Sequence, residues 1–179
     1  MLNITNTQYH QSSVCIFAVM KATLLVVGRT ADPRFSVLID EYIQRTRFYL
    51  SFEMEVIPEL RNTKNLSQEQ QKEKEGELIL KALAPGDHVV LLDEHGREFR
   101  SVDFAQWMQK KMNTVSKRLV FIVGGPYGFS QAVYQKANEK ISLSQMTFSH
   151  QMIRMIFAEQ IYRAMTIRSS QLLVPALVR

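Results

Sequence analysis

The sequence predicts an α/β fold in which a mostly parallel sheet is sandwiched by helices. Short β-branched and aliphatic runs, each the length of one strand, alternate with longer segments whose apolar residues recur at helical spacing. Several of the strand-like runs are apolar at almost every position, as expected of strands that are buried on both faces. A chain of 179 residues, 46% hydrophobic and 22% charged, has the length and balance of one globular domain.

The first half of the chain alternates between strand and helix. The expected elements are a strand over 21–28, a helix over 33–49, a strand over 52–57, a loop over 58–65 and a helix over 67–83. Asp32 and Pro33 begin the first helix, because aspartate caps helices and proline suits their first turn. Ser67 and Gln70 have the spacing of a capping box, which sets the start of the second helix.

The second half continues the alternation. The expected elements are a strand over 88–93, a turn over 94–96, a helix from 101, a strand over 118–123, a helix over 130–137, a strand over 140–143 and a helix over 149–167. Ser101 is the expected cap of its helix. The run 118–123 is the clearest buried strand in the chain, and Gly124 and Gly125 follow it at once.

Composition excludes several classes of protein. Cys15 is the single cysteine, so no intramolecular disulfide forms, and no metal site is expected because the histidines have no ligand spacing. No apolar run reaches the ~20 residues that cross a bilayer, so we expect a cytoplasmic protein with no membrane contact. The net charge of +5 is compatible with a polyanionic partner without requiring one. Residues 1–19 are expected to be a poorly ordered extension, with one domain over 20–168.

Three polar or glycine-rich segments follow strands, at 93–96, 124–128 and 142–149. Ligands bind to parallel sheets at the carboxyl ends of strands, so these segments are the candidate binding site. The glycine turn 124–128 either lets main-chain atoms approach a ligand or is only a tight connection, and it lacks the residues of a phosphate-binding loop. The segment 142–149 either wraps a flat ring or supplies core residues (Leu143, Met146, Phe148) and helix caps (Thr147 or Ser149).

The last expected helix carries the most informative charges. His150 stands at its start, where it either contacts substrate or only belongs to the cap region. Arg154 has mostly apolar neighbours, so we expect it to line an anion site or to pair across an interface. Glu159 and Arg163 have the spacing of a stabilising i, i+4 pair.

Three ordered motifs resemble a known family. They are Val120-Phe-Ile-Val-Gly-Gly-Pro-Tyr-Gly-Phe129, Ser142-Leu-Ser-Gln-Met-Thr-Phe148 and His150-x-x-x-Arg154-x-x-x-x-Glu159-Gln-x-Tyr-Arg-Ala164. The chain resembles the ribosomal RNA large-subunit methyltransferase H (RlmH) family of the SPOUT class, from Met20 to about Ile167. The resemblance implies an α/β fold with a deep carboxyl-terminal trefoil knot, and a homodimer. It also implies methyl transfer from S-adenosylmethionine to ring nitrogen 3 of a pseudouridine in large-subunit ribosomal RNA, within the assembled ribosome.

Carried over position by position, the resemblance assigns the cofactor pocket to main-chain-rich segments. The implied cofactor-binding residues are Leu92, Gly124, Gly125, Leu143, Ser144, Gln145, Met146, Thr147 and Phe148. Arg154 is the candidate for orienting the RNA or stabilising the deprotonated base, and His150 is a weaker candidate contact. No metal is required.

The tail over 169–179 departs from the family, whose short tail carries Tyr-His and charged residues. Both Tyr and His are missing here, and Ser149 stands where proline is common. A second hypothesis is therefore a knotted dimeric protein that binds S-adenosylmethionine and ribosomal RNA but no longer transfers methyl groups. A third, a general doubly wound nucleotide-binding protein, is disfavoured because no phosphate motif accompanies the sheet.

Overall fold

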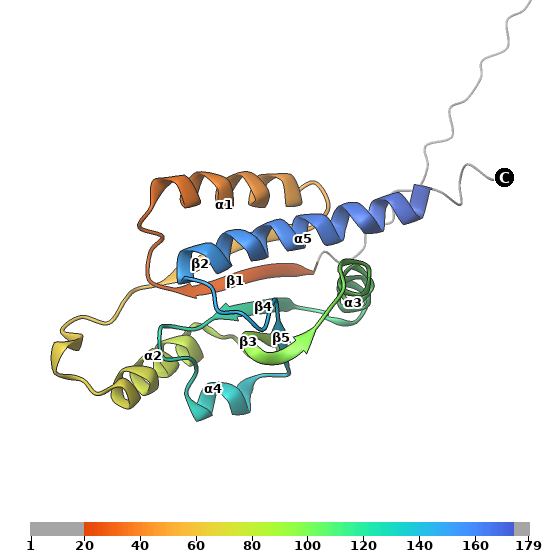
Figure 1. Cartoon of the computed structure of the whole chain (residues 1–179). Coiled ribbons are helices and arrows are strands. Elements are labelled where there is room, and N and C mark those ends of the chain that lie inside the picture. The colour runs from red at the N-terminus through yellow and green to blue at the C-terminus, as the bar shows by residue number, and fades with distance from the viewer. Residues whose placement is uncertain (1–19, 174–179) are drawn as a thin grey trace, which may run out of the picture.

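A computed structural model describes residues 20–173, which form a five-stranded sheet with helices on both faces (Figure 1). The strands are β1 (Lys21–Val27), β2 (Ser51–Ile57), β3 (His88–Glu98), β4 (Arg118–Val123) and β5 (Glu139–Ser142). Their order is β2-β1-β4-β3-β5, and every neighbouring pair is parallel. The predicted α/β fold with a parallel sheet is therefore confirmed.

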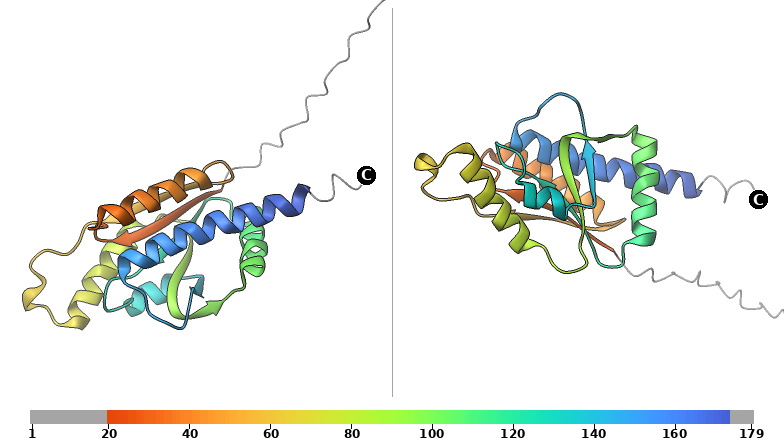
Figure 2. Two further views of the ribbon diagram at one scale, coloured as in Figure 1. Left: turned by 45° about the horizontal axis from the view of Figure 1, so that its top comes forward. Right: turned by 90° about the horizontal axis from the view of Figure 1, so that it is seen from below.

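Helices cover the sheet in two layers (Figures 1 and 2). The helices are α1 (Pro33–Thr46), α2 (Gln68–Ala82), α3 (Ser101–Thr114), α4 (Gln131–Lys136) and α5 (His150–Leu173), with a short 3₁₀ turn over Thr63–Asn65. One core packs α1, α3 and α5 against the sheet, and a second core packs α2 and α4 against the other face. On β4, Phe121 belongs to the first core and Ile122 to the second, which explains why the strand is apolar throughout.

Local signals at the starts of α1, α2 and α5 are confirmed. The Asp32 carboxylate accepts a hydrogen bond from the Arg34 amide at 2.9 Å and caps α1. Ser67 and Gln70 form both hydrogen bonds of the capping box, at 3.2 and 3.0 Å. At the start of α5, the Ser149 hydroxyl accepts from the Met152 amide at 3.3 Å.

The predicted turn over 94–96 is wrong, because β3 continues through it to Glu98. Leu92 and Arg97 both pair with Ile141, so residues 93–96 bulge out of the ladder between β3 and β5. Gly96 makes this possible, since a Cβ there would come within 2.5 Å of the Ile141 main-chain carbon. Asp93, Glu94 and His95 therefore lie in an irregular stretch of β3.

Two helix ends also differ from the prediction. Helix α1 ends at Thr46, because its carbonyl accepts from the amides of Tyr49 and Leu50 and the chain turns to bury Leu50. Helix α5 extends to Leu173, since no glycine or proline interrupts the chain before Pro175. The prediction that Ser101 caps its helix is wrong, because α3 begins at Ser101 itself and Arg100 occupies the cap position without a side-chain hydrogen bond.

Residues 1–19, expected to be an extension, lie outside the described residues, as do the last residues of the expected tail, 174–179. Within residues 20–173, no helix is both long enough and apolar enough to span a bilayer.

Candidate active site

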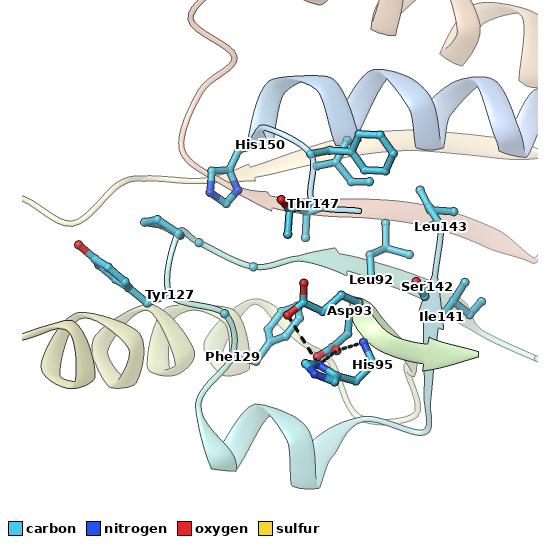
Figure 3. Close-up of a pocket in the computed structure, with 18 of the residues that line it drawn as sticks. Leu92, Asp93, His95, Tyr127, Phe129, Ile141, Ser142, Leu143, Thr147 and His150 are labelled. Carbon is cyan, nitrogen blue, oxygen red and sulfur yellow. Dashed lines mark hydrogen bonds and ion pairs between the residues drawn. The ribbon is translucent and has the colours of Figure 1, made fainter. Parts of the chain in front are cut away.

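A cavity of about 620 Å³ opens at the carboxyl ends of β3, β4 and β5 (Figure 3). Most of its walls come from residues 92–95, 123–129, 141–144 and 146–148 and from the start of α5, and Lys72 and Tyr134 also line it. In Figure 3, Tyr127 and His150 stand on one side of the cavity, and Ile141 and Leu143 stand on the other. The volume lies within the range of small-molecule sites, about 300–1,000 Å³.

The structure brings most of the predicted site residues together. Every predicted cofactor-binding residue except Gln145 lines the cavity, and His150 lines it as well. Gln145 is exposed and does not line the cavity. The three segments predicted to follow strands, 93–96, 124–128 and 142–149, therefore line one cavity, although up to about 50 residues separate them along the chain.

The glycine turn is both a tight connection and a wall of the cavity. A Cβ on Gly125 would lie 1.9 Å from the Glu75 carboxylate, and one on Gly124 would lie 3.1 Å from the Phe129 ring. Gly128 has a φ of +79°, and its amide donates to the Gly125 carbonyl at 3.1 Å. Packing thus excludes side chains at Gly124 and Gly125, and main-chain atoms of these residues face the cavity.

The segment 142–149 closes the cavity from the other side. The Ser142 hydroxyl donates to the Ser144 carbonyl at 2.9 Å, and the Ser144 hydroxyl accepts from the Met146 amide at 2.9 Å. Met146 is 73% exposed, so its interpretation as a core residue is wrong. Leu143 does pack against the core, and Phe148 is half-buried. The loop is held by its own serines, and its apolar side chains remain available to a ligand.

A polar cluster at the bulge of β3 was missed by the sequence analysis. The Tyr134 hydroxyl donates to the Asp93 carboxylate at 2.5 Å, and the His95 amide donates to it at 2.8 Å. Burial works to raise the pKa of Asp93, but these hydrogen bonds outweigh it and hold the pKa below its usual value. Burial and the Asp93 charge raise the pKa of Tyr134 to about 12. At neutral pH the cavity therefore contains a carboxylate held by a neutral phenol.

The sequence shows Asp93 at the end of the expected strand over 88–93, but it gives no sign that Tyr134 is its partner. Tyr134 lies on α4, 41 residues further along the chain, and no local pattern connects the two.

Arg154 lies outside the cavity, and the expectation that it lines an anion site is corrected. It is 3% exposed, and its guanidinium donates to the carbonyls of Val27 at 2.6 Å and Gly28 at 2.9 Å. A third bond goes to the Thr30 hydroxyl at 3.1 Å. Burial lowers the pKa of Arg154, opposed by the charge of Glu59. The side chain fastens the first turns of α5 to the end of β1 through its two terminal nitrogens, and its Nε is buried without a hydrogen-bond partner.

His150 is the first residue of α5 and lies half-buried at the cavity wall. The amino-terminal end of a helix carries partial positive charge, so this part of the wall favours anionic groups. In residues 20–173 there is no cluster of three or more His, Cys, Asp or Glu side chains able to hold a metal ion.

Comparison with known proteins identifies the family. Residues 20–172 match the family model described as "Predicted SPOUT methyltransferase". The chain is 72% identical over 148 residues to ribosomal RNA large subunit methyltransferase H of Phocaeicola vulgatus, which covers 83% of this chain and 94% of that one. It is 65% identical over 152 residues to the protein of the same name from Parabacteroides distasonis, covering 85% and 97%.

A solved structure shares the fold. The crystal structure of a probable methyltransferase from Bordetella pertussis Tohama I aligns with a TM-score of 0.51 at 12% identity, covering 83% of this chain and 96% of that one. At this identity the likeness concerns the fold alone. The family model, which matches residues 20–172, and the relatives confirm the resemblance seen in the motifs, and the chain belongs to the ribosomal RNA large subunit methyltransferase H family of SPOUT methyltransferases.

Proposed function

We propose that this protein is a ribosomal RNA methyltransferase that uses S-adenosylmethionine to methylate ring nitrogen 3 of a pseudouridine in the large subunit of the assembled ribosome. Relatives up to 72% identical are named as ribosomal RNA large subunit methyltransferases. The observation that carries the proposal is the cavity itself, because it gathers three family motifs at the carboxyl edge of one parallel sheet.

The residues present fit this cofactor. The glycine turn exposes main-chain atoms to the cavity, because a Cβ on Gly125 would collide with Glu75. Leu92, Leu143 and Phe148 are partly exposed apolar side chains that suit the flat adenine ring. When bound, S-adenosylmethionine supplies a methyl group activated by a positively charged sulfur. Leu92, Gly124, Gly125 and the segment 143–148 would hold it.

The chain's own groups act on the substrate base. The ring nitrogen must lose its proton before it can attack a methyl group, so the site needs a proton acceptor or electrostatic help. His150 lines the cavity, and in this proposal it accepts that proton or contacts the base. The amino-terminal end of α5 stabilises negative charge on the deprotonated base. Arg154 acts indirectly, by holding α5 against β1.

We also propose the wider context that the family resemblance implies. The protein works as a homodimer in the cytoplasm, where ribosomes assemble, and its carboxyl-terminal part forms a deep trefoil knot. Large apolar side chains at the surface, including Phe48, which is 87% exposed, are compatible with a subunit contact. Light scattering of the purified chain measures the mass in solution, and a monomer would contradict the dimer.

A second candidate function follows from the tail. The tail lacks the Tyr and His of the family, and α5 runs on through its first residues to Leu173. The second candidate is therefore a protein that binds S-adenosylmethionine and the ribosome but no longer transfers methyl groups.

The test incubates the full chain with assembled ribosomes that lack the modification and with methyl-labelled S-adenosylmethionine, and maps the label by mass spectrometry of the digested RNA. We expect label on one pseudouridine. Leu143→Arg, which places a charge in the cavity, should abolish labelling, whereas the exposed Val37→Arg on α1 should not. Cofactor binding without labelling would favour the second candidate, and absence of cofactor binding by the folded chain would contradict both.

A further inference from the structure

Glu75, on α2, is a buried acid with an unsatisfied oxygen. The residue is 4% exposed, and its carboxylate oxygen Oε1 accepts a hydrogen bond from the side-chain amide of Gln71 at 3.0 Å. The other oxygen, Oε2, is buried and has no hydrogen-bond partner. Among the described residues, Glu75 forms no ion pair with a basic side chain. Burying such a group without compensation is costly, so the arrangement points to a partner that the free chain does not supply.

The unsatisfied oxygen lies directly behind the cavity wall. A Cβ on Gly125 would come 1.9 Å from Glu75 Oε2, and Gly125 itself lines the cavity. Because residue 125 is glycine, it places no side chain of its own between the carboxylate and the turn. Lys72, one turn earlier on α2, reaches the cavity but pairs with Glu69 at 2.6 Å.

We propose that Glu75 makes this cavity select a positively charged cofactor over its neutral product. The inference rests on the proposed function, because it assigns a role toward S-adenosylmethionine. The carboxylate of Glu75 attracts a cation bound in the cavity on the other side of Gly125, since charges interact strongly where water is excluded. The negative charge therefore stabilises the sulfonium and offers nothing comparable to a neutral thioether.

The charge on sulfur changes during the reaction, so a preference for the charged cofactor distinguishes reactant from product. Methyl transfer breaks the bond between sulfur and the methyl carbon, and the electron pair of that bond stays on sulfur, which becomes a neutral thioether. The ring nitrogen gains the methyl group, and the proton it loses passes to solvent, directly or by way of His150. S-adenosylhomocysteine consequently loses the attraction of Glu75 at the moment it forms. The carboxylate thus favours loading of the reactant and departure of the product.

The test measures binding to the full chain by calorimetry, with three ligands. S-adenosylmethionine and sinefungin carry a positive charge at the reacting position, and S-adenosylhomocysteine does not. We expect Glu75→Gln to weaken binding of both charged ligands about tenfold, and to weaken S-adenosylhomocysteine less than about twofold. Glu73→Gln and Glu77→Gln remove a charge from exposed positions of the same helix and should change none of the three affinities.

If Glu75→Gln lowers the affinity for all three ligands equally, Glu75 only positions the turn. That result would overturn this inference and leave the proposed function intact. The unmodified chain gives a second test that does not depend on how the variant folds, because it should bind the two charged ligands more tightly than S-adenosylhomocysteine. Tighter binding of S-adenosylhomocysteine would refute the role of Glu75. Absence of binding by all three ligands to the folded unmodified chain would overturn the proposed function and this inference together.

Discussion

Replacing Arg154 by methionine should lower the stability of the fold. It should leave the cavity lining unchanged, because Arg154 does not line the cavity. The guanidinium satisfies two main-chain carbonyls at the end of β1, those of Val27 and Gly28, at 2.6 and 2.9 Å. Each buried acceptor left unpaired costs about 1–3 kcal/mol. Part of this is offset, because the buried cation and its unpartnered Nε are removed as well. We expect a net loss of about 3 kcal/mol in the free energy of unfolding.

Urea unfolding followed by circular dichroism measures this loss. With a slope of about 2 kcal/mol per molar urea for a domain of this size, the midpoint should fall by about 1.5 M. Arg163→Met is the matched control, because Arg163 lies on the same helix in an exposed pair with Glu159, and it should cost less than about 1 kcal/mol. An Arg154→Met protein with an unchanged midpoint and no methylation would refute the structural role and restore a direct contact with substrate.

Three further predictions concern the cavity wall, acid stability and the proposed chemistry. Gly125→Ala should cost about 1–3 kcal/mol of stability, since its Cβ would lie 1.9 Å from the buried Glu75 carboxylate. Adding Glu75→Ala should recover part of this lost stability. If the losses of the two substitutions in urea unfolding simply add, the clash is refuted. Burial works to raise the pKa of Asp87, but hydrogen bonds, chiefly from Arg118, outweigh it and lower the pKa, so the stabilisation is present at neutral pH and disappears as the pH falls below about 4. Asp87→Asn should thus reduce the stability difference between neutral pH and about pH 3, and an unchanged difference in urea midpoints would count against this. His150→Ala should slow methylation about 100-fold while cofactor affinity stays within about twofold, and a parallel loss of both would assign His150 to the cofactor instead.

Much of the fold could be predicted because its signals are local. The run 118–123 is apolar at nearly every position, and it is the central strand β4, covered on both faces. Asp32 and Ser67 cap helices through hydrogen bonds to residues two or three positions away. Such patterns depend on neighbours in sequence, so they can be recognised without knowing the tertiary structure.

The parts that could not be predicted depend on contacts between distant residues. The bulge after Leu92 exists because β3 pairs twice with Ile141, which lies on a strand that follows much later. Arg154 was marked by its apolar neighbours, but its partners at the end of β1 lie about 125 residues earlier. The backbone-lined cavity was predicted from three motifs, whereas the polar contact of Asp93 with Tyr134 had no sequence signal.

The central claim is that the cavity at the carboxyl ends of β3, β4 and β5 binds S-adenosylmethionine. A crystal structure of the full chain grown with the cofactor tests it most directly. We predict density for the cofactor against the glycine turn and the segment 143–148, with its charged sulfur on the cavity side of Gly125, across the turn from Glu75. Cofactor bound elsewhere, or a cavity that stays empty at saturating cofactor, would contradict the claim.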